Sequence, residues 1–235
     1  MILDIYKDSF EFASRKKSNL LILGALLFFN FLIIPVFFAY GYNYRIIKQS
    51  TQDMINSNEA PADFSDYKKM FIDGLKYIIV VIAYMIIPIL LIIAAWFIPS
   101  SASAIIALLG MILSIVAYLA ICVAVPHMAT NDDSLSAAFK FSELKNIVSA
   151  IGYGNYLLTY IGIVLISIVL VVVILFILIV LLMLSGIATI PFGANFVSLG
   201  IAWNIIINFI IFFIVAPYLT LFQCRCIGLL YNLGS

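Results

Sequence analysis

His127 is the first residue to consider for chemistry, because an imidazole beside carboxylates can bind a metal or carry a proton. It is the single histidine of the chain and follows Pro126 at the end of a long apolar run, with Asn131, Asp132 and Asp133 close behind. A zinc site needs three or more protein ligands, and no His-Glu-x-x-His motif supplies them. We therefore predict no metal site and interpret His127 as a polar residue at the membrane interface.

The three cysteines, Cys122, Cys224 and Cys226, suggest a second kind of chemistry. An odd number of cysteines gives no disulfide framework. Cys224 and Cys226 form a Cys-x-Cys pair, which is a weak ligand set and too tight for a comfortable disulfide. Free cysteine commonly behaves as a small apolar residue. We interpret all three as packing residues near the ends of apolar helices.

Amides inside the apolar runs form a more suggestive pattern. Asn204 and Asn208 are four residues apart with Gly200 one turn earlier, and Asn30 lies midway through the first run. Residues four apart on a helix share a face. Such amides can hydrogen-bond between helices as packing contacts, or they can line a path for a solute. The candidate polar intramembrane face is Asn30, Gly200, Asn204 and Asn208.

Motifs that catalysis requires are missing from the sequence. No Walker loop, dinucleotide-binding glycine fingerprint or nucleophile elbow occurs. The apolar runs contain no Asp, Glu, Lys or Arg, which proton relays, ion-coupled pumps and voltage sensors place inside the membrane. We therefore predict no catalytic residue and no cofactor. A net charge of +1 without a basic run gives no support for nucleic-acid binding.

The chain that positions these residues is very apolar. Of its 235 residues, 66% are hydrophobic and 10% are charged. Apolar runs of 18 or more residues indicate membrane-spanning helices, because a backbone in lipid must satisfy its own hydrogen bonds. We predict one domain over 1–235, an all-α polytopic transmembrane helical bundle that crosses the cell membrane several times. About five spans are expected, with a sixth left open, at approximately 20–42, 77–98, 103–125, 156–184 and 197–222.

Charged segments outside these runs are predicted to form three amphipathic interfacial helices, at approximately 2–17, 63–76 and 134–151. The stretch "EAPADFSDYKKMFIDGLK" at 59–76 places apolar residues three and four apart, with charged residues mostly opposite. Such a helix needs an apolar surface and water, and the membrane interface supplies both. We expect it to begin near Pro61 and Asp63. The candidate interfacial residues are Asp63, Phe64, Asp66, Phe71, Asp73, Gly74 and Lys76.

Basic residues give conflicting indications of orientation. With five crossings, the side that holds the first loop, the third loop and the C-terminal tail carries eight Lys and Arg, and the other side carries four. The positive-inside rule then favours an N-terminus outside the cell. Arg15, Lys16 and Lys17 directly precede the first run and favour the opposite. Both indications hold if the first run, interrupted by Pro35, is re-entrant, or if a sixth crossing exists.

Three stretches carry a family resemblance: "AYGYNYRIIKQ", "APADFSDYKKMFIDGLK" and "SAAFKFSEL". They resemble domain-of-unknown-function family 4013, polytopic membrane proteins found mainly in archaea. The matching positions are Gly41, Tyr42, Arg45, Glu59, Asp63, Phe64, Asp66, Asp73, Gly74, Leu75, Lys76, Ala138, Phe139, Phe141, Ser142 and Glu143. Ala62 and Asp63 make the Pro-x-Phe element one residue longer than in the family. The resemblance implies a membrane architecture and an archaeal origin, and it carries no activity.

Three kinds of function remain. We expect a non-enzymatic membrane component that binds lipid or a partner; membrane lipid is the expected contact, and a protein partner or a homo-oligomer is left open. The alternative is a subunit of a transporter or channel for a small uncharged solute. An enzyme is the third, and its active site would have to use the first loop or the region from Asp132 to Glu143.

Overall fold

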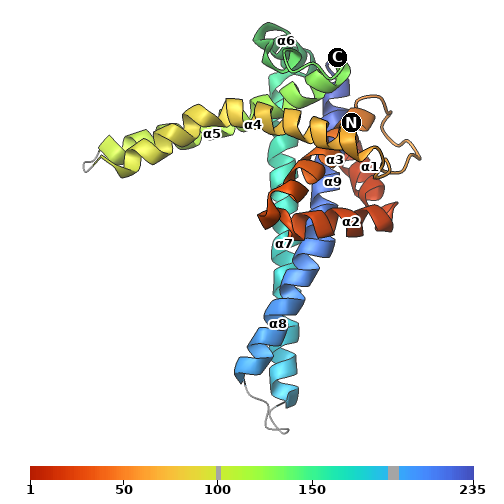
Figure 1. Cartoon of the computed structure of the whole chain (residues 1–235), viewed down its shortest axis with the longest axis vertical. Helices are drawn as coiled ribbons and strands as arrows, with labels where there is room; N and C mark the ends of the chain where they lie inside the picture. Colours follow the sequence, from red (N-terminus) through yellow and green to blue (C-terminus); the bar gives the residue numbers. More distant parts are fainter. Residues whose placement is uncertain (99–101, 190–195) are drawn as a thin grey trace.

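Helices make up the fold throughout the described residues, which are 1–98, 102–189 and 196–235 of the computed structural model (Figure 1). No strand occurs in these ranges. The elements are α1 (Ile2–Ser14), α2 (Lys17–Phe28), η1 (Asn30–Leu32), α3 (Ile34–Ser50), α4 (Tyr67–Trp96), α5 (Ala102–Thr130), η2 (Ala137–Phe139), α6 (Phe141–Ile151), α7 (Tyr153–Thr189), α8 (Phe196–Ile210), the π-helical turn η4 (Ile211–Val215) and α9 (Ala216–Asn232).

Four helical stretches within the described residues are long and apolar enough to cross a membrane: Tyr67–Trp96, Ala102–Thr130, Tyr153–Gly186 and Gly200–Asn232. They confirm an all-α, multi-pass membrane protein, and they coincide with the second to fifth predicted spans. Thirty residues of α-helix extend about 45 Å, which exceeds the roughly 30 Å of a hydrocarbon core. Helices of this length must tilt or project beyond the membrane.

The four long helices form two antiparallel hairpins. One joins α4 to α5, and the other joins α7 to the continuous stretch α8–η4–α9. Figure 1 shows the hairpins extending in different directions from a common body that contains α1, α2, α3 and α6. Each hairpin exposes large apolar side chains along its length, among them Ile87 on α4 and Phe176 on α7. Exposed apolar surface of this extent is what lipid-facing helices require.

The first apolar run, expected to be one span over 20–42, is divided in the structure. Pro35 lies in the first turn of α3, where its missing N–H leaves no helical hydrogen bond unmade, and it marks the start of a new helix. The helical conformation is interrupted at Ile33, whose φ is 64°, a value that β-branched residues rarely adopt. The chain reverses, and Asn19 Nδ2 donates to the hydroxyl of Tyr42 over 2.8 Å. The two ends of the expected span therefore meet.

The second predicted interfacial helix, 63–76, is not a separate element. Asp66 caps α4, accepting a hydrogen bond from the backbone N–H of Lys69 at 3.2 Å, so the helix begins at Tyr67 rather than near Asp63. It then runs without interruption to Trp96, because no breaking residue separates its charged start from the apolar run. For the third, predicted at 134–151, the structure has η2 and α6, and Gly152 follows α6 with φ at 89°.

Two glycines bring α3 and α4 into close contact. A Cβ at Gly41 would clash with the carbonyl of Met70, and a Cβ at Gly74 would clash with the carbonyl of Phe37. The helices therefore cross with backbone against backbone, a type of contact that small residues allow in membrane proteins. This crossing fixes the face of α3 that is turned toward α5 and α9.

Candidate ligand cavity

A cavity of about 310 Å³ lies where α3, α4, α5 and α9 converge, and we call it the central cavity. Leu27 of α2 and Asn30 of η1 border it on one side. Its volume falls at the lower end of the range for small-molecule sites. Its polar and sulfur-bearing lining consists of Asn30, Tyr40, Asn43, Tyr77, Tyr118, Cys122, Thr220, Gln223 and Cys224.

Helical spacing explains why these side chains share the cavity. On α3 the lining residues Val36, Tyr40, Asn43 and Ile47 recur every three or four positions, and therefore follow one face. The same spacing places Tyr118, Ile121, Cys122 and Val125 of α5 together, and likewise Thr220, Gln223, Cys224 and Ile227 of α9. These three helices each contribute one stripe that mixes apolar with uncharged polar residues, and α4 contributes Tyr77.

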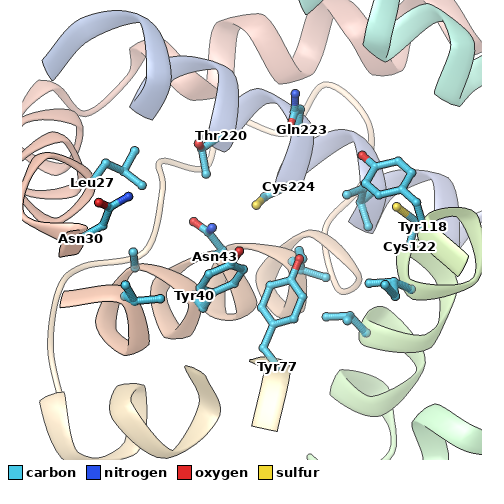
Figure 2. Close-up of a pocket in the computed structure, with 16 residues that line it drawn as sticks. Leu27, Asn30, Tyr40, Asn43, Tyr77, Tyr118, Cys122, Thr220, Gln223 and Cys224 are labelled. Atoms are coloured by element: carbon cyan, nitrogen blue, oxygen red, sulfur yellow. The ribbon is translucent and has the colours of Figure 1, made fainter. Parts of the chain in front are cut away.

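Asn43 contributes a buried polar atom that the fold leaves unpaired in this cavity. Its Oδ1 is buried and has no hydrogen-bond partner. Figure 2 shows its side chain directed into the cavity next to Tyr40, with Tyr77 and Cys224 also facing the cavity. Thr220 and Gln223 are already engaged: Thr220 Oγ1 donates to the carbonyl of Ala216, and Gln223 Nε2 donates to Ser167 Oγ over 3.2 Å.

The cavity lining carries no charged side chain among the described residues. An unpaired buried acceptor costs about 1–3 kcal/mol, which a ligand that donates a hydrogen bond would recover. Apolar walls around a few polar groups suit a molecule with an uncharged polar end and an apolar body. Among the lining residues that the structure describes, no nucleophile is paired with a base.

Only Asn30 of the predicted polar face lines the central cavity. Asn204 and Asn208 lie in a separate shallow groove on α8 with Phe28 and Phe209. Asn208 Nδ2 donates to the backbone carbonyl of Asn204 over 2.8 Å and to its Oδ1 over 3.1 Å, so the pair is bonded within its own helix. A Cβ at Gly200 would meet open space. The stripe faces outward from the chain.

The first candidate interfacial residues belong to the segment before α4. Asp63 forms an ion pair with Lys16, and Phe64 stacks on the ring of Tyr42 with centroids 3.8 Å apart. Phe64 is therefore held in the protein body rather than on an interfacial helix. Asp66 is the cap of α4 described above.

The remaining candidates lie in the first turns of α4. Phe71 packs against Phe37 and Phe38 of α3, with ring centroids 5.0 and 5.6 Å apart. Gly74 forms the close crossing with α3. These residues therefore hold α3 against α4.

Asp73 and Lys76 join a charged cluster around Asp133. The Asp133 carboxylate accepts hydrogen bonds from Lys48 Nζ at 2.6 Å and from the Tyr44 hydroxyl at 2.7 Å. Its backbone carbonyl accepts a third from Lys76 Nζ. Asp73 is buried nearby and interacts electrostatically with Asp133. The cluster ties α3 and α4 to the segment after α5.

Arg225 forms a second charged cluster, which the sequence did not reveal. Its Nε donates to Asp8 Oδ2 over 2.8 Å, its Nη1 pairs with Asp53, and its guanidinium lies 4.6 Å from the ring centroid of Phe12. Burial raises the pKa of Asp53, against the opposing effect of the Arg225 charge. The cluster joins α9 to α1 and to the segment after α3.

His127 is buried and bonded at both ring nitrogens. Nε2 lies 2.9 Å from Glu143 Oε2, and Nδ1 lies 2.9 Å from the Tyr231 hydroxyl, which also meets Thr130 Oγ1 at 3.0 Å. Because a carboxylate accepts hydrogen bonds, Nε2 is the donor to Glu143. No group of three metal-ligating side chains occurs in the part of the chain that the structure describes. His127 thus connects α5, α6 and α9 inside the protein rather than standing at its surface.

Comparison with known proteins gives a family but no precedent for the cavity. Residues 26–181 match the model of a family described as "Protein of unknown function (DUF4013)". No solved structure and no curated protein sequence matches the chain. The matched residues include the α2–α3 reversal, the α4–α5 hairpin, α6 and most of α7, and therefore three of the four cavity walls.

Proposed function

The chain belongs to the DUF4013 family of proteins of unknown function, and on that premise we propose that it is a non-enzymatic component of the cell membrane that binds a lipid or another uncharged amphiphile in the central cavity. The observation that supports this most directly is the unpaired Oδ1 of Asn43 within the cavity. A ligand hydroxyl or amide N–H would satisfy it.

The rest of the lining favours the same class of ligand. Tyr40 and Tyr77 offer hydroxyls close to Asn43, whereas Ile121, Val125 and Ile227 supply apolar wall. A charged headgroup would enter without a counter-ion, because the described lining has none to offer, and burying an unpaired charge is strongly unfavourable. The proposed ligand therefore has an uncharged, hydrogen-bonding end.

Native mass spectrometry of protein extracted gently from its own membrane, followed by lipid analysis of the bound fraction, tests this proposal. Asn43→Leu keeps a similar size and removes the hydrogen-bonding group. We expect it to lower the retained amount of one amphiphile about five- to tenfold, the loss of one hydrogen bond. Asn208→Leu, outside the cavity, is the matched control and should retain the amphiphile as the unaltered protein does.

Ala39→Phe provides an independent check, because Ala39 lines the cavity and a phenyl ring there would fill it. Loss of the amphiphile in both Asn43→Leu and Ala39→Phe, with retention in Asn208→Leu, supports the central cavity as its site. Equal retention in all three variants, each eluting as folded protein, would contradict the proposal.

The alternative function is a subunit of a transporter or channel for an uncharged solute. The uncharged lining of the central cavity is the observation that favours it. Its predicted path along Asn30, Asn204 and Asn208 is spread over two separate hollows, since Asn204 and Asn208 do not line the cavity. A flux measurement in vesicles separates the two functions. Flux that Asn43→Leu abolishes would favour transport through the cavity, whereas binding without flux favours the non-transporting component.

A further inference from the structure

The two ends of the segment that we expected to be the first span contact the same residue, Asp63. Lys16 directly precedes α2 and forms an ion pair with the carboxylate of Asp63. Arg45, near the end of α3, donates from Nη1 to the backbone carbonyl of the same Asp63 over 2.8 Å. A single helix from Lys16 to Arg45 would separate these ends by roughly 44 Å. Residues 17–44 therefore leave the charged part of the protein and return to it.

All the charged segments are joined on that same side. Arg225 pairs with Asp8 of α1, Lys48 pairs with Asp133 after α5, and Arg15 donates to the carbonyl of Glu59. The chain has twelve Lys and Arg, and none lies between residues 77 and 131 or between 146 and 224. With four crossings, every basic residue falls on one face of the membrane, which the positive-inside rule places in the cytoplasm. This arrangement removes the conflict between the two orientation signals.

The reversing segment lies beside the apolar part of a span. A Cβ at Gly24 would come within 2.8 Å of the Cα of Phe213, and the ring of Phe28 lies 5.6 Å from that of Phe213. Phe213 is twelve residues before Arg225, about 18 Å along the helix. Figure 1 shows α2 lying across the hairpin of α7 and α8–α9, next to α3. The reversal is therefore held against the apolar part of the span formed by α8, η4 and α9.

The turn of this reversal is apolar and uncovered. We call six consecutive or nearly consecutive residues the insertion tip, and each is between 39% and 68% exposed. They are Phe28, Phe29, Phe31, Leu32, Ile33 and Ile34. At 12 residues, α2 extends about 18 Å, which is too short to cross roughly 30 Å of hydrocarbon. The segment has the length to enter a bilayer and return, with Lys16, Lys17 and Arg45 at its charged base.

We propose that the insertion tip is a lipid-contacting surface, which the re-entrant α2–η1–α3 hairpin places inside the bilayer from the cytoplasmic face. Hydrocarbon chains cover the tip, because the span of α8, η4 and α9 that contacts it exposes the same kind of apolar surface, for example at Phe209 and Ile214. Leu27 and Asn30, at the tip end of the hairpin, also border the central cavity, so the cavity borders the lipid phase on this side.

Cysteine labelling in sealed vesicles of known orientation tests the reversal. Leu3→Cys on α1, Ala60→Cys before α4 and Ala104→Cys at the uncharged end of α5 all lie at exposed positions, whereas the three native cysteines are buried. With a membrane-impermeant maleimide, we expect Leu3→Cys and Ala60→Cys to react from the cytoplasmic side only and Ala104→Cys from the other side only. Reaction of Leu3→Cys and Ala60→Cys from opposite sides would show a crossing and overturn the proposal.

A spin label at Leu32→Cys tests the contact with lipid. Collision with oxygen reports hydrocarbon, and collision with a neutral nickel chelate reports water. We expect Leu32→Cys to match Ile87→Cys, on the exposed apolar face of α4, and to differ from Ala60→Cys. Strong nickel collision at Leu32→Cys would place the tip in water, and weak collision with both reagents would place it against protein; either result overturns the proposal.

Discussion

Arg225 on α9 donates from Nε to Asp8 Oδ2 on α1 over 2.8 Å, and neither side chain has any exposed surface. The guanidinium also pairs with Asp53, so one cation serves two carboxylates. These contacts join segments that lie 217 and 172 residues apart in the sequence. They close the protein body around α1, α3 and α9.

We therefore expect Arg225→Met to destabilise the protein by about 3–5 kcal/mol, because it leaves two buried carboxylates without their partner. The measurement is the free energy of unfolding in a mixed detergent titration. Lys7→Met removes an exposed cation from the same helix as Asp8 and should change stability by less than about 1 kcal/mol. An Arg225→Met protein as stable as the Lys7→Met control would mean that the cluster does not hold the body together.

The crossing of α3 and α4 gives a second prediction. Gly41→Ala and Gly74→Ala each add a methyl group that would clash with a backbone carbonyl of the facing helix, so the helices must separate. We expect a loss of about 1–3 kcal/mol for each, the usual effect of overpacking.

Gly200→Ala is the matched control for the crossing, because a Cβ there meets nothing within 4 Å. It should leave the unfolding free energy unchanged or slightly higher, since alanine favours the helix by about 1 kcal/mol. Equal effects at all three glycines would argue that helix propensity, rather than the close crossing, determines the outcome.

The long helices could be predicted from the sequence because a run of apolar residues in lipid has few alternatives to a helix. The path of the first run could not be predicted in this way, because mean hydropathy measures how apolar a segment is and does not report where the chain turns back. Pro35 was visible as an interruption, but the reversal depends on the conformation of Ile33 and on contacts such as Asn19 with Tyr42. Those contacts join residues from separate helices, and no periodicity within one helix reports them.

The central cavity escaped prediction for a similar reason. Asn43, Tyr77 and Cys224 each look like an ordinary residue of its own helix, and the site exists only where their helices converge. Asn204 and Asn208 were predicted to form a polar face because they are four residues apart on one helix. In the structure they hydrogen-bond to each other and face outward. Tyr118 and Cys122, four residues apart and shortly before Pro126, were a signal in the sequence that could have revealed the cavity.

Acid should weaken the protein partly through Asp133. Burial acts to raise the pKa of Asp133, but the hydrogen bonds from Lys48 and Tyr44 outweigh it and hold that pKa below the ordinary value of 3.8. A carboxyl group with a lowered pKa stabilises the folded state above its unfolded pKa, and this contribution is lost as the pH falls through the lower, folded value. Stability should therefore decline as the pH drops below about 4.

Comparing Asp133→Asn with Asp132→Asn isolates this contribution. Asp133→Asn should be less stable at neutral pH and should lose less on acidification, because its amide does not titrate. Asp132→Asn changes the neighbouring, exposed residue and should keep the full acid response. Unfolding free energies measured from about pH 7 down to about pH 2, a range that includes the titration of an unfolded Asp near pH 3.9, decide between them. Acid responses of the same size in both variants would exclude Asp133 as a source.

His127 connects three helices, and its loss should loosen one of them more than the others. In His127→Phe the Glu143 carboxylate and the Tyr231 hydroxyl each lose a partner, although Tyr231 keeps Thr130. We expect about 1–3 kcal/mol of destabilisation, and faster amide hydrogen exchange in α6, which Glu143 helps to attach to α5. Lys140→Met removes only the exposed ion pair of Glu143 and should leave that exchange close to normal. Unchanged exchange of α6 in His127→Phe would mean that apolar packing through Leu144, Ile147 and Ile151 holds α6 in place without the histidine.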